Sequence, residues 1–324
     1  MSSTERLVVV LGPTASGKSA LAITLAERLG GEVLVCDSTQ VYRRFDIGTA
    51  KVPLAEQRGI PHHLVDLVEP SEVFTAGDYR RRAVEVLDGV RARRKLPILT
   101  AGTGLYLRAL LEGLSDAPQR SEKLRERLRS SVERRGAIHL HRILARLDPA
   151  AGARIAAMDT QKIIRAVEMR LLAGKPVDEI HRTGRRGLEG YAVIKIGLNP
   201  PRERLYERIS TRTAQMARSG WIDEVRERTA AGVPDDAKPF QFIGYSEMRQ
   251  CIEGKLTEES AIEQIQRATR QFAKRQLTWF RREPEVTWLQ GFGDDPEIAE
   301  AALAICSRSP VIGQDEGEIR RRIL

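Results

Sequence analysis

The first hundred residues alternate short apolar runs with longer segments in which apolar residues recur every three or four positions. The apolar runs predict strands at about 7–11, 32–36 and 97–100. The segments between them predict helices at 19–29 and 76–94, and a further helix follows the third strand. Strands that alternate with helices favour a parallel sheet, and such sheets bind their ligands at the carboxyl ends of the strands.

The pattern changes after residue 114. Up to about residue 190 the chain reads as helical segments that carry many charges. Residues 191–198 again predict a strand, and long helical segments follow at about 202–231 and 258–282. The region between the third and fourth strands is therefore expected to be a helical insertion into the α/β core.

These elements predict a fold class and a division into domains. We expect an α/β protein with a P-loop NTPase-like parallel sheet, helices on both faces of that sheet, and an inserted all-helical domain. The predicted core comprises residues 1–115 and 191–307, and the predicted insertion comprises 116–190. Residues 308–324 are rich in charge, and we expect them to form a disordered tail.

Glycine-rich or polar motifs follow each of the first three strands. The first of them, GPTASGKS, fits the P-loop pattern and lies between a strand and a helix. Backbone N–H groups and the helix N-terminus would bind phosphate oxygens there. Lys18 would neutralise phosphate charge and the Ser19 hydroxyl would bind Mg²⁺. The predicted phosphate-binding residues are Gly12, Pro13, Thr14, Ala15, Ser16, Gly17, Lys18 and Ser19.

Two further motifs leave alternatives open. Asp37 directly follows the second strand, where its carboxylate could act as a general base or simply cap the next turn. Residues 102–104 (GTG) follow the third strand and could stabilise charge on a leaving or bridging oxygen. From the residues alone, a tight turn that requires glycines is the simpler explanation of this second motif.

The formal net charge of +9 and the isoelectric point near 9.7 suit a polyanionic partner or an anionic substrate, although an arginine-rich protein need have neither. Arg267, Arg270 and Lys274 share one face of a predicted helix, with Phe272 and Trp279 interleaved. Such a face can follow a phosphate backbone or can merely be solvated. Both interpretations remain open.

Other features limit the class of protein. The longest uninterrupted apolar run suits a strand and is too short to span a membrane. Cys36, Cys251 and Cys306 are far apart and odd in number, so they predict neither a disulfide framework nor a metal cluster. His62 and His63 are expected to have structural roles. We expect a cytoplasmic monomer that does not bind membranes.

Seven motifs, taken together and in order, resemble those of the bacterial tRNA dimethylallyltransferases (tRNA isopentenyltransferases). They are GPTASGKS (12–19), DSTQVYRRFDIGTAK (37–51), PHHLVD (61–66), AGTGLYLRALLEGL (101–114), QKIIRAVE (161–168), FIGYSE (242–247) and TRQFAKRQLTWFR (269–281). The sequence departs from the family pattern at Ala101, Lys162 and Ser246, where that pattern usually has Gly, Arg, and Lys or Arg. These departures affect expected contacts rather than the expected reaction.

The resemblance implies transfer of a dimethylallyl group from dimethylallyl diphosphate to N6 of the adenosine immediately 3′ of the tRNA anticodon (position 37). Mg²⁺ would be the cofactor, bound by Ser19. Asp37 would take the N6 proton, Thr103 would stabilise the bridging oxygen, and Lys18 and Arg212 would contact the diphosphate.

The resemblance also implies that the insertion clamps the anticodon stem-loop and that the target base flips out to reach the diphosphate. Residues implied to contact tRNA are Asp37, Ser38, Thr39, Gln40, Thr103, Arg125, Gln161, Lys162, Ile163, Ile164, Arg165, Gln241, Phe242, Ile243, Gly244, Tyr245 and Ser246. The competing functions are a P-loop kinase of a nucleoside or other small metabolite, a transferase that prenylates free adenine nucleotides, and a non-catalytic RNA-binding protein.

Overall fold

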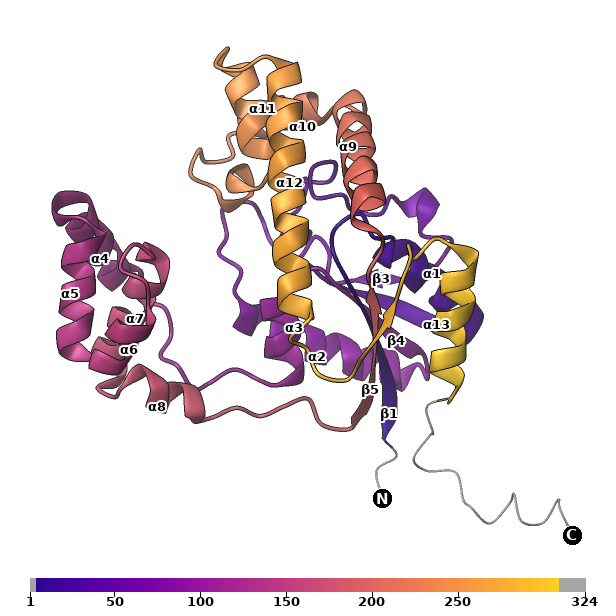
Figure 1. Ribbon diagram of the computed structural model, residues 1–324, viewed down its shortest axis with the longest axis horizontal. Coiled ribbons are helices and arrows are strands. Elements are labelled where there is room, and N and C mark those ends of the chain that lie inside the picture. Colours follow the sequence, from indigo (N-terminus) through magenta and orange to yellow (C-terminus); the bar gives the residue numbers. More distant parts are fainter. Residues whose placement is uncertain (1–3, 309–324) are drawn as a thin grey trace, which may run out of the picture. The chain divides into compact units, whose positions relative to one another are not determined.

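The computed structural model describes residues 4–308, which form two compact units (Figure 1). Unit 1 consists of residues 4–110 and 189–308, and unit 2 consists of residues 111–188. The sequence analysis placed the insertion at 116–190. Residues 309–324, for which a disordered tail was predicted, lie outside the described part of the chain.

Unit 1 is built on a six-stranded sheet in which every pair of neighbouring strands is parallel. In sheet order the strands are β3 (His62–His63), β2 (Gly31–Cys36), β4 (Leu96–Ala101), β1 (Glu5–Leu11), β5 (Tyr191–Leu198) and β6 (Val286–Leu289). The prediction of a parallel α/β sheet is confirmed. The two edge strands β3 and β6 were not predicted, because two and four residues are too short to show a pattern.

Helices cover both faces of this sheet (Figure 1). On one face, α1 (Lys18–Leu29) and α13 (Pro296–Arg308) bury Leu21, Leu25 and Ala302 against alternate strand residues such as Val8 and Val10. The intervening strand residues face the other side, where α2 (Ala76–Ala92) and α3 (Gly104–Leu111) pack. The short helix η1 (Leu54–Glu56) lies in the β2–β3 connection.

A helical layer follows β5. It contains α9 (Arg202–Arg218), α10 (Trp221–Ala230), η2 (Lys238–Gln241), α11 (Tyr245–Ile252) and the long α12 (Glu258–Phe280), which packs along α9 (Figure 1). The single helix predicted at 202–231 is in fact two helices. Gly220 adopts φ 91°, a left-handed conformation that ends the first and begins the second.

Unit 2 is entirely helical within residues 111–188. Its helices are α4 (Glu122–Arg135), α5 (Ala137–Leu147), α6 (Pro149–Arg154), α7 (Thr160–Ala173) and α8 (Val177–Arg182). They enclose a core that includes Leu128, Leu140, Leu144 and Val167. The buried Asp148 carboxylate accepts hydrogen bonds from Ala151 N–H at 3.0 Å and Val177 N–H at 2.7 Å, and so ties α6 to α8.

Candidate active site

The three polar motifs lie side by side because the strands that precede them end in the same register. Ala101 at the end of β4 pairs with Leu11 of β1 on one side and with Cys36 of β2 on the other. The residues that follow these strands, Gly12, Gly102 and Asp37, therefore emerge next to one another at the carboxyl edge of the sheet.

The P-loop wraps tightly against neighbouring backbone. Gly17 has φ 86° and caps α1, and a Cβ at this position would lie 2.5 Å from an Asp294 carboxylate oxygen. Only glycine tolerates both the conformation and the close approach. The loop also receives support from beyond β6, where Gly293 N–H donates to the Ser16 carbonyl at 2.8 Å.

Lys18 is held within the loop. Its ammonium donates to the Pro13 carbonyl oxygen at 2.7 Å. Burial lowers the pKa of Lys18 from 10.5 to about 8, with Asp37 opposing this effect and Arg212 adding to it. A bound anion would restore the charged form, so this lysine is suited to binding phosphate.

The two oxygens of the Asp37 carboxylate have different surroundings. Its Oδ1 accepts hydrogen bonds from Thr39 N–H at 2.8 Å and from Thr39 Oγ at 2.7 Å, which is the turn-capping role weighed from the sequence. Its Oδ2 lies beside Gly102, where a Cβ would approach it to 2.5 Å. Capping through Oδ1 therefore fixes the orientation of the carboxylate and leaves Oδ2 next to Gly102.

Thr103 lies at the same edge, and its hydroxyl bonds to the turn that carries Asp37. Its Oγ accepts from Ser38 N–H at 2.9 Å and donates to Ser38 Oγ at 3.2 Å. Gly102 N–H and Thr103 N–H both donate to the Cys36 carbonyl at 3.0 Å. The Gly-Thr-Gly segment is thus the tight turn that the glycines favoured, and it braces the adjacent carboxylate.

Two pockets adjoin at Asp37. The first, which we call the phosphate pocket, has a volume of about 550 Å³ and is lined by the P-loop residues 14–19 together with Arg208, Arg212 and Gln276. The second, which we call the apolar pocket, has a volume of about 350 Å³. Residues that line both pockets are Thr14, Ala15, Asp37, Thr49, Ala50, Arg212 and Phe272. The carboxylate and the P-loop therefore form a shared wall between a phosphate-binding space and a largely apolar one.

Arginines of α9 complete the phosphate pocket. Burial lowers the pKa of Arg212, with nearby Arg208 adding to this effect. Arg208 is held by two hydrogen bonds to the Asp294 carboxylate, at 2.8 and 2.7 Å, and stacks over Phe292 at 4.7 Å. Arg212 therefore presents buried positive charge that an anion in this pocket would compensate.

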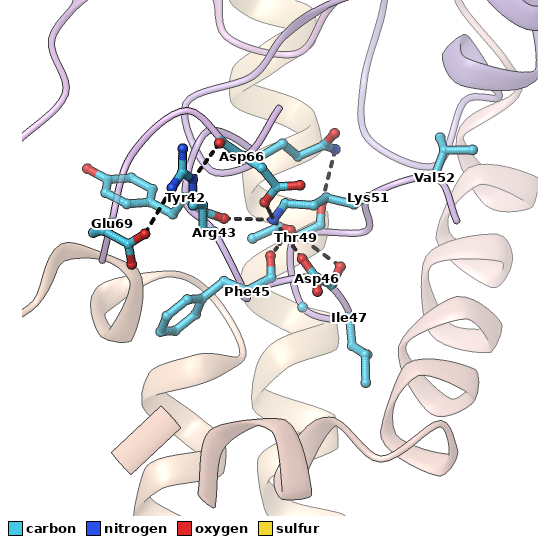
Figure 2. A network of polar contacts seen from close by, with 12 residues as sticks. Tyr42, Arg43, Phe45, Asp46, Ile47, Thr49, Lys51, Val52, Asp66 and Glu69 are labelled. Atoms are coloured by element: carbon cyan, nitrogen blue, oxygen red, sulfur yellow. Dashed lines mark hydrogen bonds and ion pairs between the residues drawn. The ribbon is translucent and has the colours of Figure 1, made fainter. Parts of the chain in front are cut away.

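The loop between β2 and β3 forms another wall, and Lys51 holds it in shape (Figure 2). The Lys51 ammonium donates to the Tyr42 carbonyl at 2.7 Å, to Asp46 at 2.6 Å and to Asp66 at 2.5 Å. Gln40 Nε2 donates to the Thr49 carbonyl at 3.0 Å. These contacts close the loop on itself next to the pockets.

The helical layer fixes the far side of that loop. The buried Glu224 carboxylate accepts from Asp46 N–H at 2.8 Å, from Ile47 N–H at 3.0 Å and from the Tyr245 hydroxyl at 2.5 Å. The Tyr245 hydroxyl in turn accepts from Gly48 N–H at 3.1 Å. Burial, with Glu224 nearby, raises the pKa of Tyr245, so its hydroxyl stays protonated.

The predicted tRNA contacts of unit 1 divide into two groups. Gln40 lines the phosphate pocket, Ser38 and Thr39 line the apolar pocket, and Gln241, Phe242 and Ile243 line the apolar pocket as well. Gly244 is buried against Trp221, and Ser246 Oγ donates to Glu247 at 2.7 Å. The Tyr245 side chain is fully buried and supports the loop described above, and a tRNA contact at this position stays a prediction.

The predicted tRNA contacts of unit 2 also divide. Gln161 and Lys162 are exposed, whereas the side chains of Ile163 and Ile164 pack in the core of the unit, and tRNA contacts at these four positions stay a prediction. The four residues lie on an amphipathic helix, α7, in which one face is exposed and the other packs in the core. Arg125 forms two hydrogen bonds to buried Glu168, at 3.0 and 2.8 Å, and Arg165 forms one at 2.6 Å.

Glu168 is charged despite its burial. Burial alone would raise its pKa, but hydrogen bonds from Arg125, Arg165 and Ser121 N–H outweigh that effect and lower the pKa to about 2. Arg125 and Arg165 are thereby fixed in orientation, and their exposed edges remain candidates for contacts with RNA.

The basic face of α12 is only partly exposed. Arg267, Lys274 and Arg275 are exposed, while Arg270 donates to Ser210 Oγ at 3.3 Å and Phe272 lines both pockets. The choice between an RNA-binding face and a solvated one stays a prediction for these three side chains.

Sequence reasoning missed several residues of the site. Gln276, Lys51 and Arg208 all line the phosphate pocket, and none was singled out as a site residue. Gln276 carried a detectable signal, because it occupies the buried stripe of α12 between Ala273 and Phe280, where an apolar residue is expected. A polar residue on a core stripe indicates a specific partner.

Residues 4–308 contain neither a cluster of metal-binding side chains nor a membrane-spanning helix. No cluster of three or more histidine, cysteine, aspartate or glutamate side chains could hold a metal ion on its own. In the same range, no helix combines the length and apolar character needed to cross a bilayer.

A parallel sheet that carries a P-loop, with a carboxylate at the neighbouring strand end, defines a phosphate-binding protein of the P-loop class. Comparison with known proteins narrows this class to one family of transferases. The family model for IPP transferase matches residues 40–283. The chain belongs to the tRNA dimethylallyltransferase family, an assignment that supports prenyl transfer over the kinase alternative.

Individual relatives agree with this assignment. The chain is 53% identical to the tRNA dimethylallyltransferase of Solibacter usitatus over 92% of its own length and 96% of the relative's, and 50% identical to that of Koribacter versatilis over 94% and 98%. The solved tRNA isopentenylpyrophosphate transferase of Bacillus halodurans is 39% identical, with a TM-score of 0.69 over 94% of this chain and 96% of that one. A solved eukaryotic dimethylallyltransferase acting on tRNA is 26% identical, with a TM-score of 0.81 over 96% and 81%.

Proposed function

We propose that this protein transfers a dimethylallyl group from dimethylallyl diphosphate to N6 of the adenosine immediately 3′ of the anticodon in tRNA. The observation that carries this proposal is the position of Asp37, which forms part of the wall of both the phosphate pocket and the apolar pocket. A carboxylate at this junction can meet a base in one space while the diphosphate occupies the other.

The diphosphate would lie in the P-loop. Backbone N–H groups at the start of α1, the Lys18 ammonium and the Arg212 guanidinium supply positive charge to its oxygens. Mg²⁺ would be held by the Ser19 hydroxyl together with diphosphate oxygens, and it would supply further charge stabilisation. The donor set fits this cation, because Ser19 and Asp37 line the same pocket and offer oxygen atoms.

In the reaction, the bond between C1 of the dimethylallyl group and the bridging oxygen breaks, and its electron pair leaves with the diphosphate. The N6 lone pair of adenosine forms the new bond to C1. The proton released from N6 passes to the Asp37 carboxylate, whose Oδ1 is occupied by the hydrogen bonds from Thr39 and whose Oδ2 is the proposed proton acceptor. The Lys18 ammonium, the Arg212 guanidinium and the P-loop N–H groups lower the barrier by stabilising the negative charge that develops on the leaving oxygen.

Thr103 would help to hold Asp37 in place, because its hydroxyl accepts from Ser38 N–H at 2.9 Å and donates to Ser38 Oγ at 3.2 Å. The contact with the bridging oxygen that the family resemblance implies for Thr103 remains part of this proposal. The target adenosine has to leave the stack of the anticodon loop to enter the apolar pocket, at a cost of a few kcal/mol.

Unit 2 would bind the anticodon stem-loop. Residues 111–188 contain 17 lysines and arginines against 10 aspartates and glutamates, a formal net charge of +7 out of +9 for the whole chain. Exposed Lys162 and Gln161, with Arg125 and Arg165, supply the contacts proposed from the motif. A cytoplasmic monomer is the form in which we expect the protein to act.

The test is incubation of the purified protein with labelled dimethylallyl diphosphate, Mg²⁺ and unmodified tRNA. We expect label on one adenosine next to the anticodon, none on free AMP and no transfer of the ATP γ-phosphate. Labelling of AMP instead of tRNA would favour the nucleotide prenyltransferase. Binding of tRNA without any transfer would favour the non-catalytic RNA-binding protein.

A further inference from the structure

Gln276 is a buried amide with two strong hydrogen bonds to the active-site backbone. It lies near the end of α12, only 6% of its surface is exposed, and it lines the phosphate pocket. Its Oε1 accepts from Thr14 N–H at 2.7 Å, and its Nε2 donates to the Gly102 carbonyl at 2.7 Å. A residue 262 positions from Thr14 and 174 from Gly102 thus connects the ends of β1 and β4.

The two bonded groups belong to the two halves of the proposed reaction. Thr14 is part of the P-loop, which would hold the diphosphate. Gly102 lies against Asp37 Oδ2, the proposed proton acceptor. One side chain therefore spans the leaving group's site and the base.

The requirement for an amide is specific. The group facing Thr14 N–H has to accept and the group facing the Gly102 carbonyl has to donate, and glutamine supplies both from one planar group. Removal of either bond would leave a buried donor or acceptor without a partner, so local rearrangement of these backbone segments would follow.

We propose that Gln276 is a positioning residue that sets the separation between the P-loop and the Asp37 carboxylate. This inference rests on the proposed function. Gln276 contacts neither base nor diphosphate in the proposal, and it acts through the backbone at Thr14 and Gly102. Its loss should therefore lower the rate of transfer far more than the affinity for tRNA.

The first experiment compares Gln276→Met with Gln271→Met. Methionine has a similar length and lacks both hydrogen-bonding groups, and Gln271 is an exposed residue of the same helix. Because misplacement by about 1 Å can cost about 100-fold, we expect kcat of Gln276→Met to fall by roughly 10- to 100-fold with the tRNA Kd within about 2-fold of wild type. An unchanged kcat, or equal losses in kcat and tRNA affinity, would overturn the proposal.

The second experiment uses Gln276→Glu as a conditional replacement. An ionised carboxylate repels the Gly102 carbonyl, whereas a protonated carboxyl group donates to it and still accepts from Thr14 N–H. Burial and the contact with the Gly102 carbonyl oxygen both favour the protonated form. We therefore expect the ratio of the variant's kcat to the wild-type kcat to rise several-fold as the pH falls from 8 to 6.

The ratio to wild type isolates this residue from the other ionisable groups of the pocket, which both proteins share. These groups are Lys18, Asp37, Lys51, Glu56, Arg208 and Arg212. A ratio that stays flat, at either a high or a low level, would contradict the donor–acceptor role, because a purely structural loss has no reason to recover on acidification.

The proposed function and this inference can fail separately. Wild-type protein that transfers nothing to tRNA would refute the function. Gln276→Met would then be judged by calorimetric binding of dimethylallyl diphosphate: affinity within 2-fold of wild type, with Gln271→Met also unchanged, would refute the link to the P-loop as well.

Discussion

Unit 1 and unit 2 differ in their net charge and in how far their charged side chains are exposed. Unit 2 carries a formal net charge of +7 in 78 residues, while the rest of the chain carries only +2. In unit 1 the charges that shape the site are specifically paired, and those of Lys51 and Glu224 are also largely removed from solvent. In unit 2 most arginines are exposed.

This difference suggests that the two tasks of the enzyme are physically separable. Chemistry needs a few groups held in place within fractions of an ångström, which burial and hydrogen bonds provide. Attraction of a nucleic acid needs many positive charges whose individual positions matter less. Substitutions of the groups that line the unit 1 pockets should therefore lower kcat, and substitutions of exposed arginines in unit 2 should weaken tRNA binding in a salt-dependent manner.

The largest effect is expected at Asp37. Asp37→Asn keeps the oxygen that accepts from Thr39 and removes the proton acceptor, so we expect kcat to fall by about 100- to 10,000-fold. The tRNA Kd should stay within a few-fold of wild type in a filter-binding assay. Asp88→Asn, at an exposed position on α2, is the control. Near-normal kcat in Asp37→Asn would exclude the carboxylate as the base.

The next effect tests unit 2. Arg182 and Arg185 are exposed and line a surface depression of that unit with Arg154 and His181. If both contact phosphates, the double substitution to glutamine should lower the slope of log K against log salt by about 2, because each contact contributes about 0.9. The kcat at saturating tRNA should be unchanged.

The matched control for this pair is Arg82→Gln on α2 of unit 1, which is equally exposed. Its salt slope should equal that of wild type. Equal slopes for the double variant and wild type would show that Arg182 and Arg185 make no phosphate contacts. That result would contradict the assignment of RNA binding to the exposed charges of this part of unit 2.

A smaller effect is expected at Tyr245. Tyr245→Phe leaves a buried Glu224 oxygen and Gly48 N–H without the partner they share, which should lower the free energy of unfolding by about 1–3 kcal/mol. Urea denaturation measures this change. The salt slope for tRNA should not change, because the residue is buried, and a changed slope would support the predicted RNA contact at Tyr245.

The smallest effect concerns the pH dependence at Lys18. Its pKa of about 8 lies below the ordinary 10.5, so binding of an anionic diphosphate should draw a proton onto it near and above pH 8. Affinity for dimethylallyl diphosphate should accordingly fall a few-fold as the pH rises from 8 to 9. Calorimetry in two buffers of different ionisation enthalpy reports the proton uptake, which Lys18→Met should abolish.

The lowered pKa of Lys18 also makes the stability of the folded protein depend on pH. Between pH 8 and 10.5 the unfolded chain holds this proton and the folded protein does not, so stability rises with pH across that window. Below pH 8 both states hold the proton, and the full cost of burying a charged lysine is present. In thermal denaturation, Lys18→Met should be more stable than wild type at pH 7. This gain in stability should be smaller at pH 10.

Much of the fold could be predicted because its signals are local. The four longer strands and the helices between them are visible as short-range patterns, and the motif at Gly12–Ser19 needs only its own residues to define its function. Boundaries failed where one residue decides them, as at Gly220, whose left-handed conformation divides a predicted helix.

The resemblance also assigned function to whole motifs, in which some residues have other roles. Within 161–165, Gln161 and Lys162 face solvent while Ile163 and Ile164 fill the core of unit 2. Within 241–246, Phe242 lines a pocket while Tyr245 supports a loop from behind. A motif records which residues occur together, and helical periodicity then decides which of them reach the surface.

The sequence by itself determined which groups stand at the carboxyl edge of the sheet, since each follows its own strand directly and parallel strands end together. Only the tertiary structure decided what surrounds them: Gln276 joining Thr14 to Gly102, Arg212 facing the P-loop, and Glu224 holding the loop at Asp46. These partners are separated by up to 262 positions along the chain. Contacts over such distances depend on how whole helices pack, and no pattern within a short window encodes that packing.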